Sequence, residues 1–187
     1  LNAMTSTDYT LYYAITPKKH FKASLDVVSE RAYHAKLRES DIEKEKPIII
    51  EEINRYLDIP EAKVFHNMIE LAGQKHQIGQ LVLGDEEDIK SFDRQKVKSY
   101  YSKYYSPKNM VLVISGSFDQ DRALARVKEI FSDYDCTQSS FEESFKIDQE
   151  EPRIDLEYKD ISQAHFVIGT YGYGYNEYIG TLGGPII

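Results

Sequence analysis

The sequence lacks several features that would place it in common classes of protein. Its 187 residues contain no tryptophan and one cysteine, Cys136, so an intrachain disulfide is excluded. One cysteine fits a reducing compartment, which slightly favours the cytoplasm, and does not exclude an exported protein. No apolar run approaches the roughly 20 residues of a membrane-spanning helix, and no signal peptide is present. The chain opens with Leu1 rather than Met, which looks like a cut end.

The familiar catalytic motifs are also missing. No two of the five histidines lie four residues apart, so no helix offers a paired-histidine zinc site. With a single cysteine there is no cysteine-based structural zinc site either. Neither a G-x-S-x-G nucleophile elbow nor a glycine-rich phosphate loop occurs. Each histidine taken alone is therefore interpreted as an ordinary core or surface residue.

Acidic residues outnumber basic residues in this chain. The chain carries 23 basic against 31 acidic residues, a formal net charge of −8. Such a chain should repel nucleic acids and anionic membrane surfaces, and the sequence shows no basic cluster that would reverse this locally. We therefore expect neither a nucleic acid nor a membrane among its partners.

The apolar pattern indicates helices mixed with strands, which is the α+β class. Strands are predicted at 9–16, 110–115, 154–158 and 164–170. Helices are predicted at 21–32, 39–57, 64–72, 97–104 and 124–134. Gly73 is the predicted C-cap of the third helix. Residues 74–84 are expected to form a loop or short strand, and the acidic stretch 137–151 has the composition of a linker.

One pair of carboxylates, Glu45 and Glu52, has a spacing that could form a metal site. Glu45 and Glu52 are seven residues apart on the second predicted helix, close to two turns, so they project from nearly the same face. Pro47 lies between them. If the helix begins near Lys46, Glu45 falls outside it and the shared face is lost, whereas Glu52 is unaffected. Spacing alone favours two exposed glutamates over a metal site.

Six short segments follow one another in a characteristic order. They are Asn2-Ala-Met-Thr-Ser6 with Tyr12-Tyr13, the helix with Glu45 and Glu52, His76-Gln-Ile-Gly79 with Leu83-Gly84, Tyr104-Tyr-Ser-Pro-Lys-Asn-Met110 through Gly116, Gln163-Ala-His165 through Gly169, and Leu182-Gly-Gly184. Each is weak alone, and together they are specific. In this order they resemble the pitrilysin/insulinase family of zinc metallopeptidases, which is related to mitochondrial processing peptidase.

The resemblance implies a metallopeptidase half-barrel, in which a mostly antiparallel sheet packs against helices, and a set of site residues. In this family two histidines of H-x-x-E-H bind zinc, its glutamate is the general base, and a glutamate of a downstream helix is the third protein ligand. By position that ligand is Glu52, and Glu45 supports the metal site from nearby. The edge strand with Asn2, Ala3 and Thr5 would bind an extended peptide substrate through its backbone.

The sequence departs from the family because it contains no H-x-x-E-H. The family places that motif before the edge strand, so the general base is expected upstream of Leu1 and the zinc site in this chain is incomplete. The resemblance divides the chain into the rest of an N-terminal peptidase domain (1–136), a linker (137–151) and the start of a following homologous domain (152–187).

Three functions remain open at this point. The first is a zinc endopeptidase that cleaves peptides or unfolded segments, present here as a fragment that is inactive alone. The second is a non-catalytic homologue that acts as partner or scaffold subunit. The third is an unrelated acidic binding domain. The expected partners are a peptide substrate and a homologous subunit or second half-domain.

Overall fold

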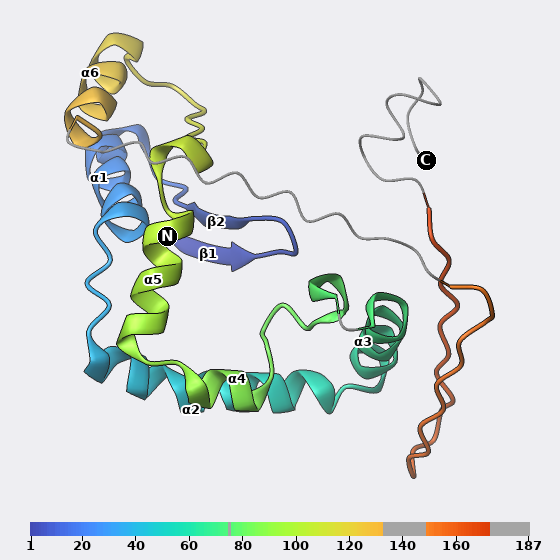
Figure 1. The fold of residues 1–187 in the computed structure, drawn as a ribbon. Helices are drawn as coiled ribbons and strands as arrows, with labels where there is room; N and C mark the ends of the chain where they lie inside the picture. The colour runs from blue at the N-terminus through green and yellow to red at the C-terminus, as the bar shows by residue number, and fades with distance from the viewer. Residues whose placement is uncertain (75, 133–148, 173–187) are drawn as a thin grey trace. The chain divides into compact units, whose positions relative to one another are not determined.

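The computed structural model describes residues 1–74, 76–132 and 149–172 (Figure 1). These residues fall into two compact units, one formed by residues 1–54 and 82–132 and the other by 55–81 and 149–172. Helices accompanied by a small antiparallel sheet confirm the predicted α+β class. Residue 136, most of the predicted linker and the segment 182–184 lie outside the described residues.

The sheet of the first unit is a strand pair at the start of the chain. Strand β1 (Asn2–Thr5) runs antiparallel to β2 (Thr10–Tyr13), with Asn2 opposite Tyr13 and Thr5 opposite Thr10. The Ser6 N–H donates to the Tyr9 carbonyl at 2.8 Å and closes the connecting turn. The strand predicted at 9–16 is therefore present but shorter at both ends.

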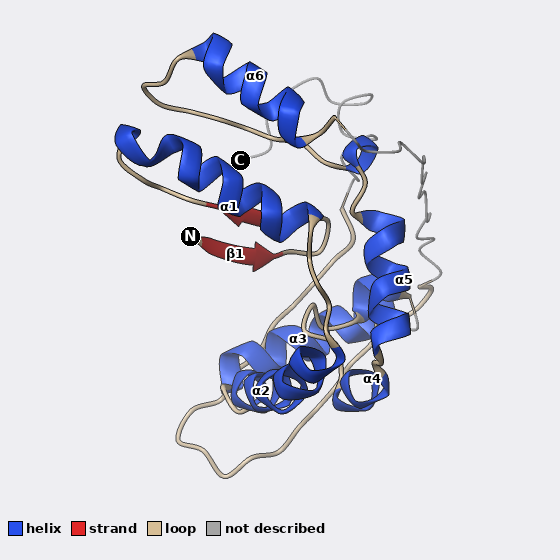
Figure 2. Ribbon diagram, turned by 90° about the vertical axis from the view of Figure 1, so that its left-hand side faces the viewer, coloured by secondary structure: helices blue, strands red, loops and turns tan. Residues whose placement is uncertain are grey.

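Helix α1 (Phe21–Tyr33) lies between the strand pair and α6 (Gln120–Ile130), as Figure 2 shows. Leu25 and Ala32 of α1 are buried, as their helical spacing predicts. Helix α6 begins at Gln120 rather than at 124, and it buries Ala123 whereas the predicted core residue Leu124 is 54% exposed. The rings of Tyr33 and Phe131 meet at 4.5 Å between centroids. The predicted amphipathic helices are thus the elements that hold this unit together.

A tyrosine cluster attaches α5 (Arg94–Tyr104) to the same unit. The Tyr101 hydroxyl donates to the Ala32 carbonyl at 2.7 Å, and the Tyr101 and Tyr105 rings stack at 4.7 Å. The Tyr105 hydroxyl shares a hydrogen bond of 3.2 Å with Tyr12 of β2. Burial and this hydrogen bond raise the pKa of Tyr105 to about 12.

The long helix α2 (Glu39–Leu57) has the predicted bounds, with Pro47 in its interior. Because the helix begins at Glu39, Glu45 lies inside it and shares a face with Glu52. The short helix α4 (Glu86–Ser91) was not predicted; it is capped by Asp85, whose side chain accepts from the Asp88 N–H at 2.8 Å. The Lys46 ammonium donates to the Lys90 carbonyl at 3.4 Å.

The second unit is built on α3 (Pro60–Gly73) and a 3-10 turn, η2 (Gln77–Gly79). The residue at the C-cap is Gln74, with φ 50°, so the prediction for Gly73 was wrong by one position. Gly73 is glycine for another reason: a Cβ there would lie 2.4 Å from the Gly79 nitrogen. The two glycines let the turn pack directly on the end of the helix.

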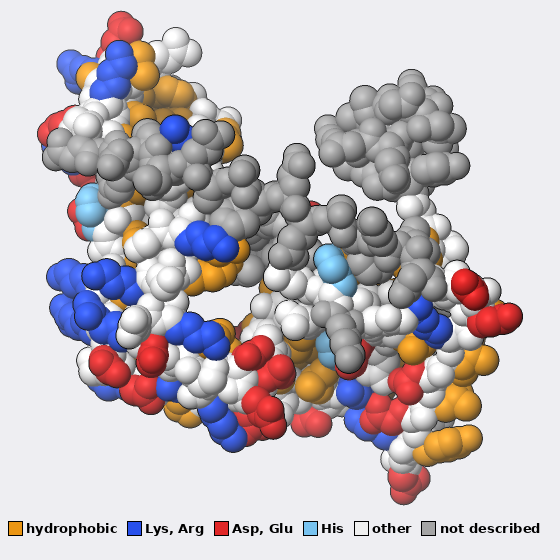
Figure 3. Space-filling view, in the orientation of Figure 1, with side chains coloured by type: hydrophobic (Ala, Val, Ile, Leu, Met, Phe, Trp, Pro, Cys, Tyr) orange, Lys and Arg blue, Asp and Glu red, His pale blue; other side chains and the backbone are white. Residues whose placement is uncertain are grey.

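The remaining predicted strands were wrong: residues 110–115, 154–158 and 164–170 form no strand. A strand needs a hydrogen-bonded neighbour, and the described residues supply none to these segments. Their apolar side chains are accordingly exposed, as with Val111 (89%), Ile154 (77%) and Phe166 (82%), and Figure 3 shows apolar atoms along the stretch from 149 to 172.

This stretch nevertheless contacts α3. The Arg153 guanidinium donates to the Leu71 carbonyl at 3.1 Å, and the Tyr171 hydroxyl donates to the Ala72 carbonyl at 2.7 Å. Along the described part of the chain, no helix combines the length and the apolar character that crossing a membrane requires.

Candidate functional site

Glu45 and Glu52 both lie on the solvent side of α2. Both carboxylates are exposed, and neither forms a hydrogen bond or ion pair with a described residue. This contrasts with Glu43 on the same helix, which pairs with Lys46 at 2.6 Å. Ile53, next to Glu52, is buried and anchors the helix. The packing therefore presents Glu52 outward, with both carboxylate oxygens open to a ligand.

The carboxylates of Glu45 and Glu52 do not by themselves form a complete zinc site. Zinc in a catalytic site takes three protein ligands, usually including histidine. Among the described residues no group of three or more His, Cys, Asp or Glu side chains is placed to hold a metal ion. Glu52 is one oxygen donor and Glu45 a second carboxylate on the same face, so any zinc here would need nitrogen ligands that these residues do not supply.

The histidines of the second unit, His66, His76 and His165, contact neighbouring residues of that unit rather than a metal-binding group. His66 lies 3.9 Å from Glu70, and burial lowers its pKa. His165 lies 3.7 Å from Glu61. The His76 ring accepts from the Ile78 N–H at 3.2 Å and caps the 3-10 turn. Each has a local structural neighbour, in agreement with the sequence interpretation.

The predicted substrate strand, β1, is exposed along its whole length and pairs with β2 on one side. The Asn2 side-chain oxygen accepts from the Ala3 N–H at 2.9 Å, and its amide nitrogen donates to the Tyr13 hydroxyl at 3.4 Å. Thr5 faces Thr10 across the pair. A peptide that pairs with Ala3 would thus have to displace the Asn2 side chain. No hydrogen bond between described residues joins β1 to Glu45 or Glu52.

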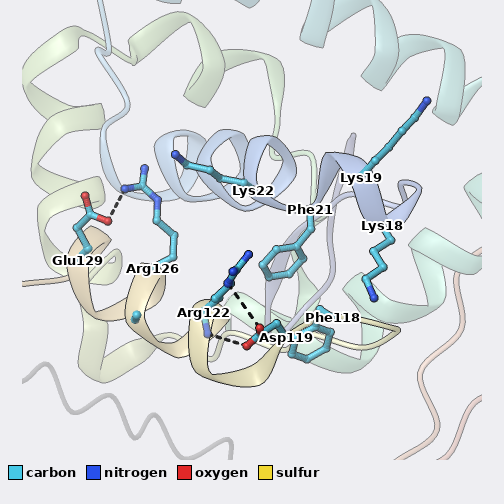
Figure 4. Close-up of a pocket in the computed structure, with 10 residues that line it drawn as sticks. Lys18, Lys19, Phe21, Lys22, Phe118, Asp119, Arg122, Arg126 and Glu129 are labelled. Carbon is cyan, nitrogen blue, oxygen red and sulfur yellow. Dashed lines mark hydrogen bonds and ion pairs between the residues drawn. The ribbon is translucent and has the colours of Figure 1, made fainter.

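The structure also contains a pocket that the sequence interpretation missed. It lies between one face of α6 and the start of α1 together with the 3-10 turn before it, η1 (Lys18–His20). It has a volume of about 520 Å³ and is drawn in Figure 4. Its cationic side chains are Lys18, Lys19, Lys22, Arg122 and Arg126. This corrects the expectation of no basic cluster. Three of the cations lie within the short stretch 18–22, and the two arginines come from a segment about a hundred residues later, so the full cluster forms only when the two segments pack together.

Comparison with known proteins decides the family. Residues 1–86 match the model of the insulinase family, peptidase family M16, and residues 91–179 match the model of the peptidase M16 inactive domain. The chain belongs to the M16 family of pitrilysin- and insulinase-type peptidases. The family that the edge strand and the glutamate helix indicated is therefore confirmed.

Curated relatives of this M16 chain include an uncharacterized zinc protease, YmxG, of Bacillus subtilis, 30% identical over 92% of this chain and 41% of its own length. The β subunit of human mitochondrial-processing peptidase is 30% identical over 73% of this chain and 28% of its own length. The chain thus spans less than half the length of these relatives.

Solved structures agree with this assignment. An M16-like peptidase from Alicyclobacillus acidocaldarius superposes with a TM-score of 0.56 at 26% identity, over 65% of this chain and 28% of the other. The first half of the periplasmic protease PqqL from Escherichia coli gives a TM-score of 0.64 at 20% identity, over 80% of this chain and 32% of the other. These similarities support the M16 peptidase fold.

Proposed function

We propose that this M16 chain is part of a zinc-dependent endopeptidase that cleaves peptides or unfolded segments, and that Glu52 is its ligand to the metal. The observation that carries the proposal is an exposed Glu52 in the interior of α2 with no partner among the described residues. A carboxylate held on a regular helix, with both oxygens open, suits metal coordination better than one already paired with a lysine.

Glu45 has a supporting role in this proposal. It lies two turns before Glu52 on the same face of α2, which suits it to accept a hydrogen bond from a metal-bound histidine rather than to bind the metal itself. Two histidines and a general base have to come from an H-x-x-E-H helix that residues 1–187 do not contain. Zinc in such a site would supply Lewis-acid chemistry. Without those partners we expect the chain to be inactive.

Substrate would bind as an extended strand along β1. Its exposed edge offers backbone groups from Asn2 to Thr5, and backbone pairing accepts many side-chain sequences. The proposed domain division is the rest of a peptidase domain at 1–136, a linker at 137–151, and the start of a second homologous domain from 152. That second half-domain, or a homologous subunit, would complete the chamber around the peptide.

The test is chelator-sensitive cleavage by the polypeptide that carries the H-x-x-E-H segment ahead of this chain. A fluorogenic unfolded peptide should be hydrolysed by that polypeptide, and 1,10-phenanthroline should stop the reaction. The 187-residue chain alone should show no cleavage, with or without the chelator. Cleavage by the isolated chain would overturn the assignment of histidines and base to another segment.

A non-catalytic subunit is the second candidate. It is favoured by the similarity to a protein named as one subunit of a processing peptidase. The coding sequence that precedes Leu1 separates the two functions. If it encodes no H-x-x-E-H and the complete protein binds no zinc but co-purifies with a zinc-loaded homologue, the subunit function holds and the peptidase proposal fails.

A further inference from the structure

We propose that the pocket between α1 and α6, here called the basic pocket, binds an acidic peptide segment that carries an apolar side chain between its carboxylates. This site is separate in the sequence from both Glu52 and β1. It would therefore serve recognition of an acidic protein partner rather than zinc binding or backbone pairing with a substrate.

Charge is the first observation behind the proposal. Five cationic side chains line the basic pocket; against its carboxylates Asp119 and Glu129 and the adjacent Asp26, which pairs with Arg126, they leave a net formal charge of +2 in a chain whose formal net charge is −8. A local potential of the opposite sign to the whole molecule attracts acidic groups selectively.

The two carboxylates of the pocket, and Asp26 beside it, are already paired with its arginines. Arg126 pairs with Asp26 at 2.8 Å and with Glu129 at 2.7 Å, which raises its pKa. Arg122 lies 3.6 Å from Asp119. These pairs satisfy the acidic groups of the pocket internally, so they do not compete for the lysines.

The three lysines of the pocket are the cations that form no ion pair with a described residue. Lys19 and Lys22 form no ion pair with a described residue, and the Lys18 ammonium has only the Ser117 hydroxyl, at 3.3 Å, among the described residues. A lysine ammonium on a flexible stem acts as a point charge that can follow a carboxylate of variable position. An acidic peptide provides carboxylates of that kind.

The apolar part of the pocket is a pair of stacked rings. Phe21 and Phe118 lie parallel, with an interplanar angle of 1° and centroids 5.5 Å apart. Figure 4 shows the rings between Lys18 on one side and Arg122 on the other, while Lys19 extends away from them. An apolar side chain could lie against the rings while flanking carboxylates reach the cations.

Size and charge also argue for a peptide over a nucleic acid. The volume of about 520 Å³ lies in the range of ligand pockets, roughly 300–1,000 Å³, and has room for only a few residues. Nucleic-acid binding needs several phosphate contacts along an extended surface. The confined basic pocket, in an otherwise acidic chain, offers too few.

The experiment is fluorescence polarisation with the 187-residue chain and a fluorescein-labelled decapeptide of glutamates around a central phenylalanine. Binding should weaken about fivefold in Lys22→Gln, which removes one exposed lysine of the basic pocket, and should fall with salt because the lysines are exposed. Lys128→Gln is the matched control, since Lys128 is exposed on α6 outside the basic pocket. It should bind as the unaltered chain does. Circular dichroism verifies that each variant is folded.

Three results would overturn the proposal. The first is equal binding of a decapeptide with glutamine in place of glutamate. The second is an equal loss in the Lys128→Gln control, which would indicate an effect of overall charge. The third is that inorganic phosphate or a single-stranded DNA oligonucleotide displaces the peptide at equal concentration of charge, which would indicate a general anion surface.

Discussion

The contact between Gly73 and Gly79 gives the sharpest prediction about the fold. Gly73 ends α3, and a Cβ added to it would lie 2.4 Å from the Gly79 nitrogen and 2.5 Å from the Gly79 Cα. These are backbone atoms, so no side-chain rotation relieves the overlap. In Gly73→Ala the 3-10 turn must therefore move away from the helix.

The expected magnitude combines three contributions. Overpacking costs about 1–3 kcal/mol. The displaced turn also strains the hydrogen bond from the His76 N–H to the Gly73 carbonyl, 2.9 Å long, and such a bond contributes about 1 kcal/mol. Alanine in a helix offsets about 1 kcal/mol of this. The net loss is about 1–3 kcal/mol, a fall in Tm of roughly 3–10 °C for a chain of this length.

The matched control is Gly172→Ala, because an added Cβ there meets no atom within 4 Å. The assay is thermal unfolding followed by circular dichroism, with amide hydrogen exchange to localise the change. Exchange should accelerate in the last turn of α3 and in η2, and the control should differ little from the unaltered chain. A Gly73→Ala chain as stable as the control would refute the close-contact explanation.

Three further predictions address other parts of the structure. Pro47→Ala should stabilise the chain by up to about 3 kcal/mol in urea unfolding, because Pro47 interrupts the interior of α2; no gain would contradict the continuous helix. Tyr105→Phe should lose about 1 kcal/mol near neutral pH with the Tyr12 hydrogen bond. Burial raises the pKa of Tyr105 to about 12, so its contribution to stability is present below about pH 10 and is lost as pH rises toward 12. The unaltered chain should therefore lose more stability between about pH 10 and 12 than Tyr105→Phe does. Parallel plots of unfolding free energy against pH for the two chains would contradict this. The exposed β1 edge should cause concentration-dependent self-association in light scattering, which Met4→Lys should reduce; a monomer at all concentrations would contradict it.

Most of the helices were predictable from sequence because their signals are local, although the short α4 was not predicted and α6 begins at Gln120 rather than at 124. Apolar spacing in α1 and the caps and prolines around α2 and α3 lie within the elements themselves, so the bounds of α2 matched despite Pro47. The strands were harder. The run from 110 to 115 has strand composition, but a strand exists only when another segment pairs with it, and composition does not reveal that segment.

The glutamates of the candidate site were predicted from the sequence, whereas the basic pocket was not. Glu52 and Glu45 were identified because a resemblance to a family ties their spacing to a role, and the structure adds that both are exposed and lack a partner among the described residues. The basic pocket was missed because Lys22 and Arg122 meet only through the packing of α1 against α6. No local pattern relates residues so far apart in the chain.

The role of Glu52 as a zinc ligand is tested most directly by the zinc content of the complete protein. The measurement compares Glu52→Gln with Glu51→Gln, its exposed neighbour on α2, by mass spectrometry of metal after dialysis. Glu51→Gln should keep the zinc of the unaltered protein, while Glu52→Gln should lose most of it, because an amide is a poorer ligand than a carboxylate. Glu45→Gln should weaken zinc affinity less, by about 10–100-fold. Full zinc content in Glu52→Gln would contradict the assignment of Glu52 as a ligand.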